Sequence, residues 1–171
     1  MNRVGVAYSL TVVAPILAGR EQETREAIEA LPAGFLARLE NLHFSRIHVV
    51  SELIFQGPRQ RYRDELQASQ LVFTSTFDGE LEPYLQALRM CADTWWRFCV
   101  GYPGGHAPSF ERWVRDHQID SSLFASAHPD ATVTAVLESL VLRERIIDFA
   151  IAARELEAPE LQRRFRDEFA R

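Results

Sequence analysis

The chain has 171 residues, of which 47% are hydrophobic and 25% charged, the composition of an ordinary globular protein with one well-buried domain. A formal net charge of -5 argues against a general nucleic-acid binder, and no apolar run approaches the roughly 20 residues that a membrane span needs. All 19 basic residues are arginine, which excludes a Schiff-base lysine and the lysine of a standard P-loop.

The first half of the chain alternates between extended and helical patterns. The β-branched run at 8–17 predicts a buried first strand rather than a signal peptide, and the charged segment 19–31 predicts a helix that Pro32 ends. We expect one or two helical turns at 35–42. A second strand is predicted at 42–55, followed by a polar connection at 56–70.

A corner at Asp78 and Gly79 joins the third strand to a helix. In "LVFTSTFDGELEPYLQAL", alternation over 70–77 puts Leu71, Phe73, Ser75 and Phe77 on one face. After the corner, the helical stripe consists of Leu81, Leu85, Leu88, Ala92, Trp95 and Cys99. We expect Asp78 to cap this helix, which the glycines after residue 100 terminate.

The rest of the chain predicts a short helix at 110–119, a fourth strand at 120–129 and a long helix at 130–157 capped by Asp130. A last polar helix follows at 160–170. The residues of the long helix that we expect to face inward are Val133, Val136, Leu137, Leu140, Ile147 and Ile151.

This order of elements is β-α-β-β-α-β and predicts an α+β fold of the ferredoxin-like type, an antiparallel sheet with helices on one face. We expect a single domain over 1–171, with its core at 8–150 and a C-terminal helical extension at 151–171. Because the strands carry apolar residues on both faces, the second face should meet either the C-terminal helices or a second subunit.

Three stretches carry a resemblance to a known family: "NLHFSRIHVV", "LVFTSTFDGELEPYLQAL" and "FASAHPDATVTAVLESLVLRERI". They resemble the ferredoxin-like modules of the dimeric α+β barrel superfamily, in particular those in or beside dye-decolourising peroxidases and other haem-peroxide proteins. His43, Phe44, Ser45 and Arg46 match one motif, and Phe77-Asp78-Gly79 matches another. The Gly-x-x-Asp-Gly loop of those peroxidases lacks its first glycine in this chain, so we assign no peroxide chemistry to Asp78.

Arg46, His48 and His128 are the candidate catalytic residues. Alternation along the second strand puts Arg46 and His48 on one face and His43 on the other. In a pocket, Arg46 could anchor a carboxylate and His48, with His128, could move a proton. The alternative is structural: an arginine paired with an acid, a histidine at a strand edge and a loop histidine.

Arg59, Arg61 and Arg63 could contact an anion or an acidic partner, or simply form a solvated loop. We predict no metal site, because no ligand spacing typical of one occurs. We predict no cofactor; the alternative is a haem held by His48 or His128 beside Trp95 and Trp96.

Three functions follow as expectations, the last of which is a structural dimer with no pocket. The first is a small-molecule-binding protein or enzyme with a largely apolar cavity, of the dimeric α+β barrel type and in an oxidative or redox context. The second is a non-catalytic accessory or scaffold subunit that docks on a haem or redox enzyme through its exposed sheet face. We expect a homodimer or a complex with a redox enzyme. Cys91 and Cys99 lie too far apart along one helix to pair, which suits a reducing cytoplasm.

Overall fold

The computed structural model describes residues 2–55, 57–58, 60–62 and 64–170. The chain divides into two compact units, residues 1–133 and residues 134–171. The first unit is a mixed α+β structure with an antiparallel sheet, and the second is a pair of helices.

The sheet has four strands in the order β1-β2-β4-β3, and every neighbouring pair is antiparallel. The strands are β1 (Arg3–Val4), β2 (Ala7–Pro15), β3 (Leu42–Val50) and β4 (Gln70–Asp78). The long central pair runs in register from Ala7 opposite Asp78 to Pro15 opposite Gln70. Strict alternation along β4 buries the four residues predicted to share one face, Leu71, Phe73, Ser75 and Phe77.

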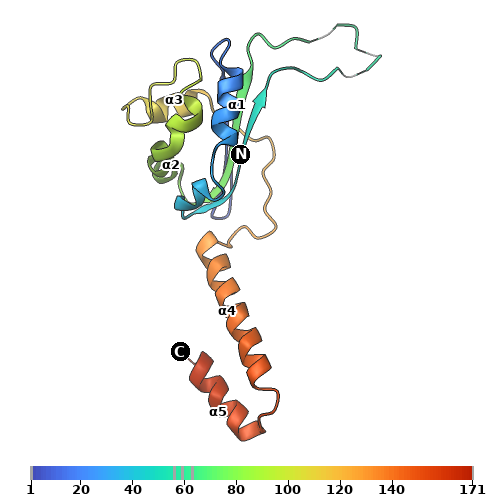
Figure 1. Ribbon diagram of the computed structural model, residues 1–171, viewed down its shortest axis with the longest axis vertical. Coiled ribbons are helices and arrows are strands. Elements are labelled where there is room, and N and C mark those ends of the chain that lie inside the picture. Colours follow the sequence, from blue (N-terminus) through green and yellow to red (C-terminus); the bar gives the residue numbers. More distant parts are fainter. Residues whose placement is uncertain (1, 56, 59, 63, 171) are drawn as a thin grey trace. The chain divides into compact units, whose positions relative to one another are not determined.

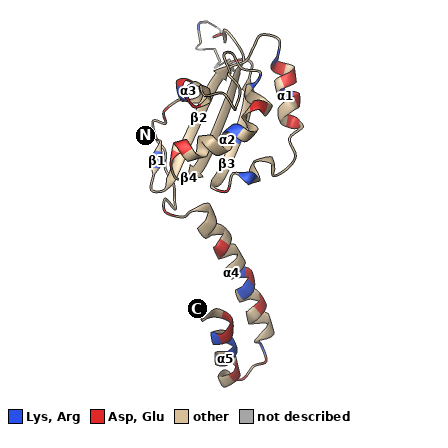
Figure 2. Ribbon diagram, turned by 90° about the vertical axis from the view of Figure 1, so that its left-hand side faces the viewer, with Lys and Arg blue, Asp and Glu red and all other residues tan. Residues whose placement is uncertain are grey.

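Helices α1 (Glu21–Glu29), α2 (Leu81–Trp96) and α3 (Phe110–Asp116) lie on one side of the sheet (Figures 1 and 2), and a 3-10 turn spans Phe35–Arg38. The stripe predicted for the helix after the corner is buried throughout. Trp95 stacks on Phe73 with ring centroids 5.7 Å apart, and Trp96 meets Phe73 edge-on, so α2 supplies the centre of the core.

The predicted strand at 120–129 is wrong. The segment just before it, residues 117–119, pairs with β2: the N–H of Val13 donates to the carbonyl of His117, and the N–H of Ile119 donates to Thr11, each at 2.8–2.9 Å. The same edge of β2 is occupied on both sides of this pairing. β1 lies opposite Ala7 and Tyr8, and the N–H of Val100 donates to the carbonyl of Pro15 at 2.8 Å, so only a short pairing fits between them.

The second strand also ends earlier than predicted, at Val50 rather than at residue 55. The described parts of 51–69 contain no helix or strand, and this connection extends beyond the end of the sheet (Figure 1). Ile54, Phe55 and Tyr62 are exposed along it. We call residues 51–69 the arm.

The second unit consists of α4 (Val133–Ala152, whose first residue belongs to the first unit) and α5 (Ala158–Phe169). Phe149 of α4 packs edge-on against Phe165 and Phe169 of α5, with ring centroids 5.8 and 5.4 Å apart. Neither helix has a buried residue. The side chains predicted to face inward along α4 are therefore on its surface in this structure, and most are strongly exposed.

Candidate functional site

The face of the sheet away from α1, α2 and α3 has no buried side chain at its centre. This open sheet face consists of Ser9, Thr11, Val13, Phe44, Arg46, His48, Val72, Thr74 and Thr76, which the strand register places side by side. Phe44 is the most exposed of the large hydrophobic residues among them, at 70%. An exposed aromatic ring beside polar groups is typical of a contact surface.

Arg46 and His48 both point to this face and are exposed, as the alternation predicted. Arg46 lies opposite Thr74 and His48 opposite Val72. Four hollows, one in the arm and three along α4 and α5, are lined by other described residues than these two. Both side chains are thus available to a partner, but within one chain they lie on an open surface.

His128 does not join Arg46 and His48. It is exposed and precedes Pro129, whose carbonyl accepts a hydrogen bond of 2.9 Å from the N–H of Val6, between β1 and β2. The strand order puts β2 and β4 between that edge and β3. The three predicted residues do not form one site within a single chain.

The predicted arginine cluster lies in the arm. Arg61 is described and exposed, whereas Arg59 and Arg63 lie outside the described residues. Acidic side chains at 52, 64 and 65 line a small hollow of about 240 Å³ in the same arm. The charge of the arm is therefore mixed rather than purely basic.

Asp78 performs a different role from the one predicted. Helix α2 starts after Glu80 and has no side-chain cap, whereas the Asp78 carboxylate accepts a bond of 2.6 Å from the N–H of Val133, the first residue of α4. Its other oxygen lies 2.7 Å from Nε2 of His43, and both side chains are largely buried. Asp78, rather than Asp130, supplies the carboxylate at the start of α4.

A β-bulge makes this contact possible. Leu42 pairs with Phe77 and Phe44 pairs with Thr76, so His43 is the extra residue and its ring turns toward the end of β4. Asn41 completes the junction, since its side-chain amide donates to the Asp78 carbonyl at 2.6 Å and its own carbonyl accepts from the Asp78 N–H.

The His43–Asp78 contact joins the two motifs that carry the family resemblance, His-Phe-Ser-Arg and Phe-Asp-Gly. Sequence reasoning named both motifs without pairing them. The sequence did hold an indication of this pairing. His43 lies at the start of one strand and Asp78 at the end of the next strand along the chain, so antiparallel pairing of the two strands brings them together. With both Asp78 oxygens bonded, the pair fastens β3 and β4 to the backbone at Val133 within the first unit.

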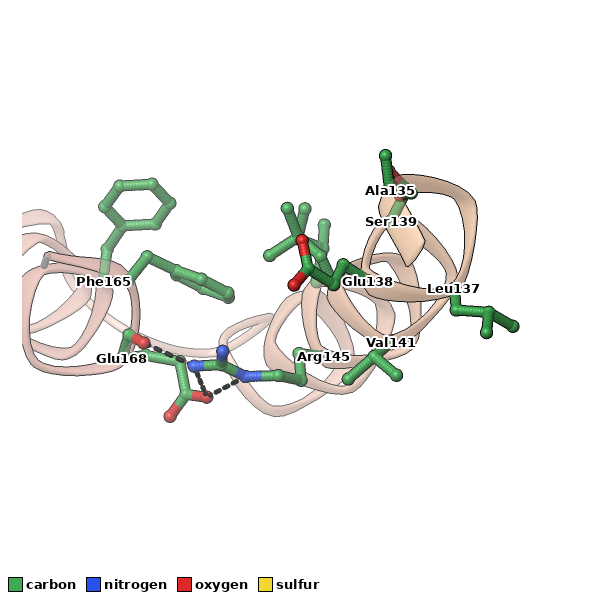
Figure 3. A pocket seen from close by; sticks show the side chains of 11 residues that line it. Ala135, Leu137, Glu138, Ser139, Val141, Arg145, Phe165 and Glu168 are labelled. Carbon is green, nitrogen blue, oxygen red and sulfur yellow. Dashed lines mark hydrogen bonds and ion pairs between the residues drawn. The ribbon is translucent and has the colours of Figure 1, made fainter. Parts of the chain in front are cut away.

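In the second unit, α4 and α5 enclose an open groove of about 930 Å³ (Figure 3). Its walls include Leu142, Ile146 and Phe165, and Arg145 is held at one side by Glu168 at 2.9 Å. Because the Arg145 guanidinium already donates to the side chain and the carbonyl of Glu168, the groove offers no free cation to an anionic ligand.

The residues considered for a haem do not come together. Trp95 and Trp96 are completely buried on the helix-covered side of the sheet, where they pack on each other and on Phe73. His48 is on the opposite face, and His128 is beyond the far edge. These residues therefore do not fit a haem within one chain. Among the described residues, no three His, Cys, Asp or Glu side chains are grouped closely enough to hold a metal ion.

The Asp93 carboxylate and the two thiols of the first unit have structural roles. The Asp93 carboxylate accepts bonds of 2.8 Å from the Gly105 N–H and the Tyr102 hydroxyl, and these, the backbone bond first, lower the pKa of Asp93. Burial raises the pKa of the Cys91 thiol to about 11 and that of Cys99 to about 12. Neither thiol is a reactive nucleophile.

Comparisons with protein-family models, with curated proteins and with solved structures find no match for this chain. Among the described residues, no helix combines the length and the hydrophobicity needed to cross a bilayer.

Proposed function

We propose that the first unit is a protein-binding module that docks on another protein through its open sheet face, as a non-catalytic accessory part of a haem or redox enzyme. One observation carries the proposal: helices cover one face of the sheet, while the other presents Phe44, Arg46 and His48 to solvent. A sheet with an uncovered face that holds an exposed aromatic ring is a natural surface for a partner.

The chemistry of the face defines the kind of partner. Phe44 supplies a flat apolar anchor, and Arg46 supplies fixed donors that fit a carboxylate. The threonines of β2 and β4 add short polar groups around them. The partner surface should therefore present an apolar pocket next to acidic side chains. The exposed Ile54, Phe55 and Tyr62 of the arm offer a second point of attachment.

We infer a ferredoxin-like arrangement in which residues 117–119 stand in place of a full fourth strand. Its support is the order β2-β4-β3 together with the antiparallel pairing of 117–119 on the outer edge of β2. The redox context rests on the family resemblance alone, and the contact of His43 with Asp78 supports treating its two motifs as one feature.

The test is purification of the tagged chain from its source organism, with variants of the face. Phe44→Ser and Arg46→Glu should each remove a co-purifying protein that has the absorption spectrum of a haem or flavin. Met90→Ser changes a residue on α2 that is 64% exposed, and it should retain that partner. Equal retention by all three variants, or a partner without a redox cofactor, would contradict the proposal.

A second candidate is favoured by the position of Arg46 and His48, which project two residues apart from the same face. If a second copy covers the open sheet face, both become walls of an enclosed apolar site for a small organic acid. Benzoate is a suitable probe: it should raise the melting temperature of the wild type and leave that of Arg46→Met unchanged. Equal shifts in both proteins would exclude Arg46 as the anchor.

A further inference from the structure

The outer edge of β3 is an edge of the sheet that no described strand occupies. β3 ends the strand order, whereas the outer edge of β2 is paired with β1 and with residues 117–119. β3 is nine residues long and contains no proline or lysine, two residues that commonly protect an edge strand from further pairing. A long edge of this kind is a template for an added strand.

The pairing within the sheet determines which backbone groups face this edge. Thr11 of β2 accepts a hydrogen bond from Ile119 on its outer side, so it is not in a bonded pair with β4. Alternation of bonded and non-bonded pairs across β4 then points the N–H and C=O groups of Ser45, Ile47 and Val49 away from the sheet. Within the described part of the chain, no hydrogen bond reaches the backbone of Ser45 or Ile47 from that side.

Helix α1 lies beside this edge and brings a carboxylate to it. The Arg25 guanidinium donates to the Val49 carbonyl at 3.4 Å and to the Ser51 hydroxyl at 2.7 Å, so this side of α1 faces the edge. Glu29 lies one turn further along the same side, is exposed, and has no ion pair or hydrogen bond among the described residues. Because the chain leaves β2 and enters β3 at opposite ends of the sheet, that turn leads from the level of Val49 toward Ile47.

We propose that the docking partner adds an extended segment to the outer edge of β3, with basic side chains toward α1 and acidic side chains toward the open sheet face. The proposal rests on the proposed function, because the segment belongs to the partner that covers this face. Side chains of an added strand alternate between the two sides of the sheet. On one side they meet Glu29, and on the other they meet Arg46 and His48, so charge complementarity defines the pattern.

A second copy of β3 fits this edge less well. Antiparallel pairing about a two-fold axis at Ile47 would place Arg46 of each copy opposite His48 of the other. It would also bring the two Glu29 side chains toward the same axis. Neither Arg46 nor Glu29 would then gain a neighbour of opposite charge, so the edge favours a different chain.

NMR titration of the isotopically labelled full chain with a designed peptide tests the strand addition. The probe is Val-Thr-Lys-Glu-Val-Glu-Lys-Thr-Val. With its central valine opposite Ile47, its lysines lie on the side of Glu29 and its glutamates lie opposite Arg46 and His48. The amide signals of Ser45 and Ile47 should shift. N-methylation of the central valine, whose N–H faces β3, should abolish the shifts, whereas N-methylation of a glutamate, whose N–H faces solvent, should preserve them.

The charge pattern is tested with the same assay. A peptide in which lysines and glutamates are exchanged should bind the wild type about tenfold more weakly, and Glu29→Lys should weaken binding of the original peptide by a similar factor. Equal binding of the two N-methylated peptides would overturn the strand addition, and equal binding of the exchanged peptide would overturn the charge pattern. Amide shifts of Ser45 and Ile47 on concentrating the chain without peptide would identify a second copy as the occupant and also overturn the proposal.

Co-purification separates this proposal from the proposed function. Ile47→Pro removes an N–H that takes no part in pairing with β4, and it should remove the partner just as Phe44→Ser does. If Ile47→Pro has an unchanged circular dichroism spectrum and retains a partner that Phe44→Ser loses, the partner docks on the face without adding a strand. If the peptide in millimolar excess shifts neither amide, the strand addition is likewise wrong, while the docking of a partner on the face stands.

Discussion

At the scale of single residues, Asp78 is the most connected side chain of the candidate site. Asp78→Ala removes the acceptor of the His43 ring and of the Val133 N–H, and leaves both largely buried. We expect it to lower the free energy of unfolding by about 1–3 kcal/mol in urea titrations. Asp116→Ala, which removes only an exposed ion pair with Arg112, should change it by less than about 0.5 kcal/mol. Similar losses in both would show that the corner does not stabilise the fold.

The two thiols give a second expectation at this scale. The thiolate is the nucleophile, and burial raises the pKa of Cys91 and Cys99 to about 11 and 12. At pH 8, well below both values, only about one in a thousand or fewer of these thiols is ionised, against roughly a quarter for a free cysteine. Native protein should react with Ellman's reagent far more slowly than protein in urea. Equal rates in the two conditions would show that the thiols are accessible.

Asp78 also shows where sequence reasoning stops at the level of the residue. An aspartate before a glycine and an amphipathic helix is a reasonable cap for that helix, and the sequence contains nothing against it. The residue instead caps α4, because the β-bulge at His43 and the return of the chain at residue 133 bring new partners to it. Contacts between segments that are far apart in sequence cannot be obtained from local pattern.

At the scale of the elements, the turn between β1 and β2 depends on a close approach. Gly5 has φ +60°, and a Cβ on it would lie 2.3 Å from the Pro129 carbonyl oxygen. Gly19 has φ +80° but open space around it, so it is a matched control for the backbone strain alone. We expect Gly5→Ala to lower the free energy of unfolding by at least about 1 kcal/mol more than Gly19→Ala. Equal losses of unfolding free energy in the two variants would mean that Pro129 does not pack on this turn.

The three long strands and the helices were predicted well because hydrophobic periodicity indicates them. Leu71, Phe73 and Phe77 alternate along β4, and Leu81, Leu85 and Leu88 recur along α2 at helical spacing. The prediction of a fourth strand at 120–129 was wrong because β1, which is only two residues long, pairs with the same edge of β2. An element of that length has no periodicity to detect. The apolar side of α4 was predicted correctly from its periodicity. Periodicity within one helix does not identify the surface that packs against that side.

At the scale of the whole molecule, each of the two units has one surface that its own residues do not cover. In the first unit it is the open sheet face, which the sequence predicted from the apolar residues on both sides of its strands. In the second unit it is the row of aliphatic side chains along α4, which the sequence predicted to face inward. The compositions differ, since threonine with Phe44, Arg46 and His48 forms one and aliphatic side chains form the other. We therefore expect the sheet face, with its polar groups around one aromatic ring, to bind another protein.

The most direct measurement for the docking surface is photo-crosslinking in cells of the source organism. The photoreactive residue p-benzoylphenylalanine is placed at Phe44, or at Met90 as the exposed control on the helical side. We expect one defined adduct with a haem or redox protein from position 44 and none from position 90. An adduct of the chain with itself at position 44 would instead support the ligand-binding dimer. No adduct at position 44, or the same adducts from both positions, would contradict the claim that the open sheet face binds a partner.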